Sequence, residues 1–160
     1  MILKIYPDSA LRQTSTIVSD INNEINNLIE NMTEFMVFNK GIGLAAPQVG
    51  IRQRIVIVQN DNNIISLINP RIVETYGEVF DEEGCLSLPG IWLEIERCQS
   101  TLVQYIDQKG NEVQREFDGL SARIIRHEID HLNGVLIIDY ASTIVKSLID
   151  QKYASLDGLS

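Results

Sequence analysis

The two histidines of the chain stand four residues apart, in the run His127-Glu128-Ile129-Asp130-His131. On an α-helix, residues four apart lie one turn above each other on the same face, so both imidazoles can bind one metal ion. Glu128, between them, can then reach a water molecule bound to that ion. A chain that places its only two histidines in this HExxH pattern is predicted to be a metal-dependent hydrolase.

A catalytic metal ion usually has three protein ligands and one position left for water, so a third ligand must be found. The pattern HExxHxxGxxH would supply a third histidine, but Ile137 stands at that position, and no glutamate follows Glu128. A downstream aspartate stays open as an alternative. Cys85 is the stronger candidate, because it follows a glycine in a segment predicted to be a turn, where a side chain can approach a metal closely.

Three ordered segments resemble the sequence motifs of the peptide deformylase family. They are Gly41-Ile42-Gly43-Leu44-Ala45-Ala46-Pro47-Gln48, Glu83-Gly84-Cys85-Leu86-Ser87 and the HExxH run. The opening Pro7-Asp8-Ser9-Ala10-Leu11-Arg12 also resembles the N-terminal signature of the family. HExxH alone occurs in unrelated hydrolases, whereas all three motifs in this order indicate one family. The resemblance extends from about residue 7 to residue 140.

The resemblance implies a reaction, the removal of the formyl group from the N-formylmethionyl ends of new polypeptides. Its metal ligands would be Cys85, His127 and His131, around one divalent ion. That ion is usually Fe²⁺ in the family, with Ni²⁺, Co²⁺ or Zn²⁺ as substitutes, and the ligand set does not choose among them. Glu128 would take a proton from the metal-bound water and return it to the departing amine.

The resemblance also implies how the substrate is held. The side-chain amide of Gln48 and the backbone N–H of Leu86 would stabilise the developing oxyanion. The peptide would lie extended, as an added strand, along Gly43 and Gly84, which have no side chain to obstruct it. The candidates for an apolar methionine pocket are Ile42, Leu120, Ile124 and the ring of His127.

Four further residues have expected positions around this site. Arg97 is expected to pair with Glu83 and brace the cysteine segment, and Arg123 to stand at the rim of the pocket. Asp130 is expected to contact a metal-binding side chain or to lie on the helix surface, rather than to bind the metal itself. Trp92, predicted to lie in the loop after Leu88-Pro89-Gly90, either lines the cleft or belongs to the core, and the sequence does not decide between the two.

Two rival interpretations remain. The first is a zincin-type endopeptidase, which Ile137 and the missing downstream glutamate disfavour. The second is a non-enzymatic module with a closed site of two thiolates and two imidazoles, in which Cys98 would join Cys85. The two cysteines are thirteen residues apart, so a buried free thiol is the expected role of Cys98. A Glu128→Ala change separates the interpretations, because only an enzyme would lose turnover while keeping its metal.

Composition limits the class of protein. The chain has 160 residues, is 44% hydrophobic and carries a formal net charge of −9. This is typical of one catalytic domain over residues 1–160, and it argues against nucleic-acid binding, which needs clustered basic residues. Two cysteines make no disulfide framework, and neither a secretory segment nor a membrane-spanning run is predicted. We therefore expect a cytoplasmic or similarly reducing compartment.

Hydrophobic periodicity predicts an α+β fold, with mixed or antiparallel sheets wrapped around a central helix that carries HExxH. That helix should begin after Asp118 and end at Gly134. An earlier helix has its apolar stripe over residues 21–36, with Ser19 or Asp20 as N-cap and Gly41 as its end. The predicted strands cover residues 54–58, 64–68 (stopped by Asn69-Pro70), 72–80, 101–106, 112–117 and 135–138, the fourth and fifth of them forming a hairpin.

The segment from residue 141 to 160 is predicted to be a short, partly helical tail. Its two lysines, Lys146 and Lys152, are balanced by Asp150 and Asp157. By family resemblance, many bacterial relatives end in a longer basic helix that contacts the ribosome. Ribosome contact through this neutral tail is therefore not supported, and co-sedimentation that depends on residues 141–160 would contradict the prediction.

Overall fold

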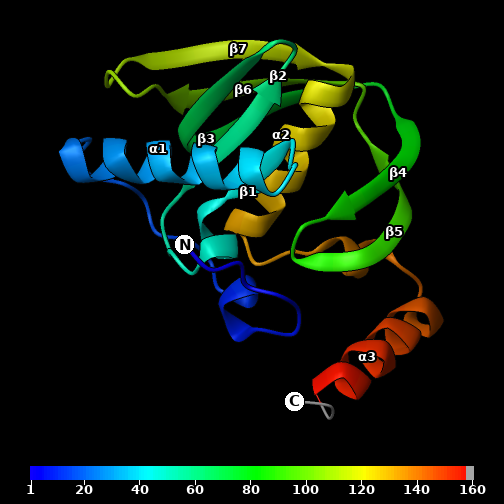
Figure 1. Ribbon diagram of the computed structural model, residues 1–160. Helices are drawn as coiled ribbons and strands as arrows, with labels where there is room; N and C mark the ends of the chain where they lie inside the picture. The colour runs from blue at the N-terminus through cyan, green and yellow to red at the C-terminus, as the bar shows by residue number, and fades with distance from the viewer. Residues whose placement is uncertain (158–160) are drawn as a thin grey trace.

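The computed structural model describes residues 1–157. Five strands form one antiparallel sheet in the order β1 (Gly43–Ala45), β2 (Ile55–Asn60), β3 (Asn63–Tyr76), β6 (Ser100–Ile106) and β7 (Glu112–Asp118). A separate antiparallel ribbon pairs β4 (Val79–Cys85) with β5 (Leu88–Arg97) (Figure 1). The predicted α+β class is confirmed, and every pair of these strands is antiparallel.

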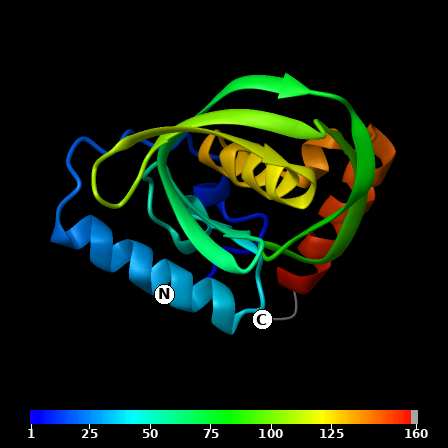
Figure 2. The same cartoon turned by 90° about the horizontal axis from the view of Figure 1, so that it is seen from above.

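Helix α2 (Gly119–Leu132) lies between the sheet and the ribbon, and strands surround it in the view from above (Figure 2). Its apolar side chains, among them Ile125 and Leu132, pack with Val56, Leu67 and Val103 of the sheet. The helix follows Asp118 and is closed by Gly134 at φ +73°, as predicted. Packing on several sides holds this helix rigidly, and its residues can therefore position a site precisely.

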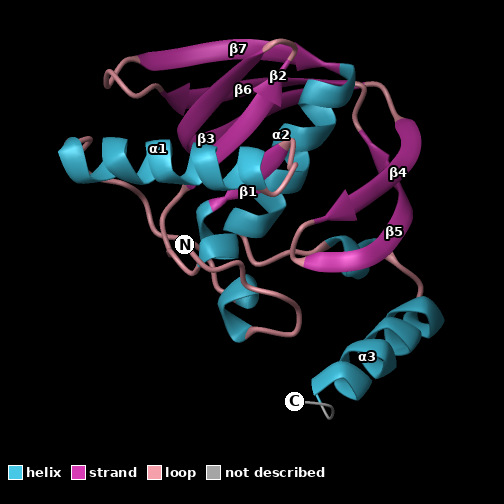
Figure 3. Ribbon diagram, in the orientation of Figure 1, coloured by secondary structure: helices cyan, strands magenta, loops and turns pink. Residues whose placement is uncertain are grey.

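Helix α1 (Asn23–Phe38) covers the outer side of the sheet with an apolar stripe, as the periodicity predicts (Figure 3). The predicted N-caps Ser19 and Asp20 are wrong, because the side chain of Asn22 accepts the backbone N–H groups of residues 24 and 25. The predicted end at Gly41 is also wrong. Lys40 takes the left-handed conformation, at φ +57°, just after the helix.

Strand β3 continues through the Asn69-Pro70 pair, which was expected to stop it. Asn69 has φ +52°, and the pairing with β6 shifts register between Ile68 and Arg71, so the pair is absorbed by a bulge. The side chain of Asn69 also donates to the carbonyl of Val18 and accepts its N–H, both at 2.9 Å. These two bonds fix the bulge against the segment before α1.

Three local predictions between residues 84 and 140 are wrong. The cysteine segment is the end of β4 rather than a turn, and the turn is formed by Leu86 and Ser87. Trp92 lies in β5 rather than in a loop. Residues 135–138 form no strand; a short 3-10 helix, Ile137–Tyr140, takes their place and buries two isoleucines.

The last helix, α3 (Thr143–Asp157), confirms that the tail is partly helical; residues 158–160 of that tail lie outside the described part of the chain. The predicted hairpin between β6 and β7 is confirmed as well. Among the described residues, no helix is both long and apolar enough to cross a membrane.

Replacing Gly134 by alanine should destabilise the fold by about 2 kcal/mol or more. Gly134 has φ +73°, and a Cβ there would lie 2.6 Å from the carbonyl oxygen of Arg12. Gly110 has φ +85°, and a Cβ added to it would meet nothing within 4 Å. Gly110→Ala therefore includes only the cost of placing alanine in the left-handed backbone conformation. Urea unfolding of both variants measures the difference. Equal destabilisation would show that the contact with Arg12 contributes nothing.

Candidate active site and metal centre

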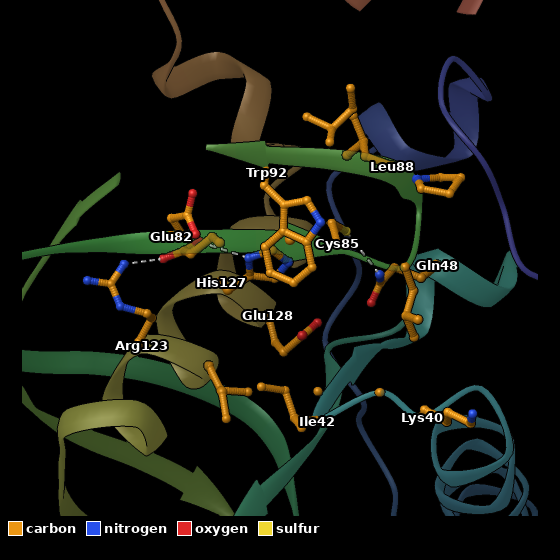
Figure 4. Close-up of a pocket in the computed structure, with 18 of the residues that line it drawn as sticks. Lys40, Ile42, Gln48, Glu82, Cys85, Leu88, Trp92, Arg123, His127 and Glu128 are labelled. Atoms are coloured by element: carbon orange, nitrogen blue, oxygen red, sulfur yellow. Dashed lines mark hydrogen bonds and ion pairs between the residues drawn. The ribbon is translucent and has the colours of Figure 1, made fainter. Parts of the chain in front are cut away.

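A cavity of about 480 Å³ opens between the β4–β5 ribbon, the segment before β1 and helix α2. Figure 4 shows that the side chains of His127, Glu128, Gln48 and Cys85 converge on it, with Trp92 in front of them. These residues come from three separate parts of the chain, as the three motifs require.

The three proposed metal ligands meet at one side of this cavity. One ligand atom from each of Cys85, His127 and His131 lies within 4.8 Å of the others, and the Cys85 Sγ is 3.2 Å from the His131 Nε2. These are the separations of atoms that can share one ion at about 2.0–2.3 Å from each. The Nδ1 of His127 lies 3.0 Å from Glu83 Oε2, which leaves the other ring nitrogen for a metal.

The electrostatics of these residues fit a bound cation. Burial lowers the pKa of His131 well below its usual range, so this imidazole is neutral, the form that binds a metal. Burial also lowers the pKa of His127, but hydrogen bonds with Cys85 and Glu83 outweigh burial and raise it. The ring of His127 therefore lies where positive charge is stabilised, and a metal ion would bring that charge.

Glu83 organises the charged groups behind the metal ligands. Burial would raise its pKa, but hydrogen bonds from His127 and Arg97 hold it at about 2. Arg97 makes two bonds to this carboxylate, at 2.9 and 3.0 Å, which confirms their expected pairing. Arg97 also bonds Asp130 at 2.6 Å, and Asp130 accepts the hydroxyl of Tyr140 at 2.7 Å. Asp130 is thus a buried partner in this network and not part of the helix surface.

Glu128 is buried beside the cluster and is directed into the cavity (Figure 4). Among the described buried side chains, its Oε2 is one of four polar atoms that have no hydrogen-bond partner, and His131 Nδ1 is another. Burial raises the pKa of Glu128 to about 7. A carboxylate with such a pKa can accept and release a proton near neutral pH.

Gln48 is held in one orientation. It follows β1 in a short 3-10 helix, Ala46–Val49, and its Oε1 accepts the backbone N–H of Ala45 at 2.8 Å. Its Nε2 is directed to Ser87 Oγ at 3.2 Å and to Cys85 Sγ at 3.6 Å. The donor end of the amide therefore faces the cysteine, next to Leu86 in the β4–β5 turn.

The two glycines expected along the substrate are enclosed by side chains of this same chain. A Cβ on Gly43 would lie 2.3 Å from Glu128 Oε1, and one on Gly84 would lie 2.9 Å from the ring of Trp92. A side chain at residue 43 would thus displace the carboxylate of Glu128. Gly43 is therefore required by its contact with Glu128 as well as by the expected approach of the substrate, and the sequence predicted only the second reason.

The expected apolar pocket residues all line the cavity. Ile124 is buried, whereas Ile42 and Leu120 are 45% and 62% exposed and lie at its mouth. Arg123 was expected at the rim, but it is buried and donates to Glu83 at 2.7 Å. Trp92 is 67% exposed and lines the cavity, so the core alternative is wrong.

Comparison with known proteins identifies the family. The family model of polypeptide deformylases matches residues 2–147. The chain belongs to the peptide deformylase family. A curated peptide deformylase from Thermodesulfovibrio yellowstonii is 42% identical over an alignment of 156 positions that covers 94% of this chain and 94% of that one. The family acts on formylmethionyl peptides, so the chain is a metal-dependent hydrolase that removes N-formyl groups.

Solved structures of deformylases share the fold. One from Legionella pneumophila superposes with a TM-score of 0.91 at 32% identity, covering 99% of this chain and 95% of that one. One from Synechococcus elongatus, in complex with actinonin, has a TM-score of 0.89 at 39% identity, covering 95% of this chain and 87% of that one.

The rival interpretations have no support in the site of this deformylase. Cys98 is not part of the group of three ligand atoms found among the described residues, and Ile137 is buried in the core. Sequence reasoning did not identify Tyr140 and Ser87, which hold Asp130 and Gln48 through hydrogen bonds. Ser87 lies inside the second motif, and its position there was a usable signal. Tyr140 lies outside all three motifs.

Proposed function

We propose that Cys85, His127 and His131 hold the divalent ion of this deformylase and that Glu128 transfers the proton in its reaction. The observation that carries the proposal is the buried Glu128 Oε2, which has no partner among the described residues, on a side chain that lines the same cavity as Cys85 and His127. When bound, the ion acidifies a water molecule and polarises the formyl oxygen. Fe²⁺ is the proposed native ion, as the family resemblance implies.

Glu128 accepts the proton as the water oxygen bonds to the formyl carbon. It gives that proton to the amide nitrogen as the carbon–nitrogen bond breaks, so formate and a free methionyl amine leave. The pKa of about 7 supports both halves of this transfer. Glu83 and Arg97 are proposed to orient His127, since the Glu83 carboxylate contacts its Nδ1.

The formyl oxygen is proposed to lie between the Gln48 amide and the backbone N–H of Leu86, because the oriented Nε2 of Gln48 already points toward Cys85. The peptide is proposed to run along Gly43 and Gly84. Its methionine side chain is proposed to contact Ile42, Leu120, Ile124 and the ring of His127, all of which line the cavity.

One experiment tests the whole assignment. The protein is purified under argon, and hydrolysis of formyl-Met-Ala-Ser is measured together with the metal content of the same sample. We expect release of formate in proportion to bound Fe²⁺, and competition by actinonin, which binds the Synechococcus elongatus relative. Hydrolysis that does not depend on the metal content would contradict the proposal.

Replacing Gln48 by alanine should lower kcat by about 100-fold or more, the usual effect of removing one oxyanion donor. Alanine also removes the bond to the Ala45 N–H. Gln48→Glu keeps that acceptor and loses the donor, so it should be similarly impaired. Steady-state kinetics of both variants decide between a role in the reaction and a purely structural one. Activity retained in Gln48→Glu would assign the effect to folding alone.

All residues in these roles lie within one domain, which we propose as the catalytic unit over residues 1–160. Ribosome contact through α3 has no support from charge, because Lys146 pairs with Asp139 and the tail's two lysines are balanced by Asp150 and Asp157. We expect no tail-dependent co-sedimentation with ribosomes.

A further inference from the structure

One face of α3 packs against the segment where β5 begins. Ile149 and Tyr153 are buried, whereas Ile144 and Leu148 on the opposite side are 75% and 60% exposed. The buried pair joins a cluster with Leu88, and Cys85 packs against that cluster. The helix therefore lies directly behind the metal-binding cysteine and cannot be a free tail.

Two hydrogen bonds join α3 to the rim of the cavity. The hydroxyl of Tyr153 donates to the carbonyl of Pro89 at 3.1 Å, and the ammonium of Lys152 donates to the carbonyl of Gly90 at 3.3 Å. Pro89, Gly90 and Ile91 all line the cavity. The side chains of α3 thus hold the backbone of the rim from its outer side.

This rim is a bulge that the ribbon does not hold by itself. Cys85 pairs with Leu88 but Gly84 pairs with Trp92, so residues 89–91 have no paired position on β4. Gly90 has φ +73°, a conformation that glycine adopts without strain. Glycine adopts other backbone conformations about as easily, so the residue itself does not fix the shape of the bulge. Because C=O and N–H of a trans peptide unit point in opposite directions, fixing the two carbonyls also fixes the Gly90 and Ile91 N–H groups.

Tyr153 is itself held firmly. Its ring contacts that of Tyr6 edge to face, with centroids 5.5 Å apart, and the N–H of Tyr6 donates to the carbonyl of Ser87 at 2.9 Å. Tyr6 also donates its hydroxyl to Asp150 on the same helix, at 2.5 Å. Burial raises the pKa of the Tyr153 phenol, which therefore stays a hydrogen-bond donor.

We propose that Tyr153, assisted by Lys152, is a positioning residue that holds the bulge of residues 89–91 in the shape that binds the peptide. The proposal rests on the proposed function, since it takes the cavity as the substrate site. Both residues lie beyond residues 2–147, the range matched by the family model.

The test uses the full chain and the variants Tyr153→Phe and Lys152→Met. Tyr153→Phe keeps the buried ring and removes one hydrogen bond, so KM for formyl-Met-Ala-Ser should rise about 2- to 10-fold while kcat stays within about twofold. Lys152→Met should have a smaller effect in the same direction. Tyr76→Phe on β3 and Lys109→Met in the β6–β7 turn are matched controls outside the cavity and should leave KM unchanged.

A second readout needs no substrate. Trp92 is the only tryptophan of the chain, and it follows the bulge on β5 with its ring against Gly84. Tyr153→Phe should change the wavelength or intensity of its emission, and the two controls should not. KM and emission equal to those of the controls, or parallel losses in kcat and melting temperature, would overturn the positioning role. A wild-type chain without deformylase activity would overturn the proposed function. The Trp92 emission would still test whether the hydrogen bond from Tyr153 to Pro89 holds the bulge.

Discussion

A Glu128→Gln variant should lose about 1000-fold or more in kcat and keep its metal. The change preserves the size of the side chain and removes the group that accepts the proton. Glu128 is buried and its Oε2 has no partner among the described residues, whereas Glu83, which lines the same cavity, is paired with Arg97 and Arg123. Rate measurements should be paired with metal analysis of the same preparation.

A matched control for this variant is Glu30→Gln, on the exposed side of α1. It makes the same chemical change far from the cavity and should retain full activity. If Glu128→Gln kept a kcat within tenfold of the wild type, proton transfer by Glu128 would be excluded. If it lost its metal as well, Glu128 would contribute to holding the ion.

Replacing Cys85 by serine should remove nearly all activity together with the metal. A serine hydroxyl does not ionise near neutral pH, so the site would have two imidazoles and no thiolate. Losing a residue that merely supports a ligand costs about 10- to 100-fold in metal affinity, and loss of a ligand should exceed that. Metal content after dialysis and a titration with Co²⁺ or Zn²⁺ measure the effect.

Cys98→Ser is the matched control, because it removes the only other thiol of the chain. It should bind metal and turn over as the wild type does. If both cysteines were needed for metal binding, the closed site of two thiolates and two imidazoles would be correct and the enzyme would need another explanation.

The residues of the candidate site could be predicted because their signals are local. Four-residue spacing on a helix places His127 and His131 together, and the structure brings their donor atoms near Cys85. Interactions between distant segments gave weaker signals. The expected pair of Arg97 and Glu83 is present, but the link from Arg97 through Asp130 to Tyr140 depends on how three elements pack.

The wrong predictions share a physical cause, which is that pairing and packing override local preference. The segment before Cys85 is rich in glutamate and lacks apolar alternation, yet β5 pairs with it over most of its length. Residues 135–138 are apolar enough for a strand, but Ile137 and Ile138 are buried in a short 3-10 helix instead. At Asn69, hydrogen bonds to Val18 let a strand pass a pair that usually ends one.

The cluster behind Cys85 joins segments that lie far apart in the sequence. Leu11 and Tyr6 from the beginning of the chain meet Ile149 and Tyr153 from α3 there. Contacts of such long sequence separation are slow to form, and during translation the native surroundings of the thiolate cannot exist until residue 153 has been made. Loading of the ion should accordingly follow synthesis: ribosome-arrested chains that end at residue 142 should not retain it through washing, and retention by them would show that the first 142 residues suffice.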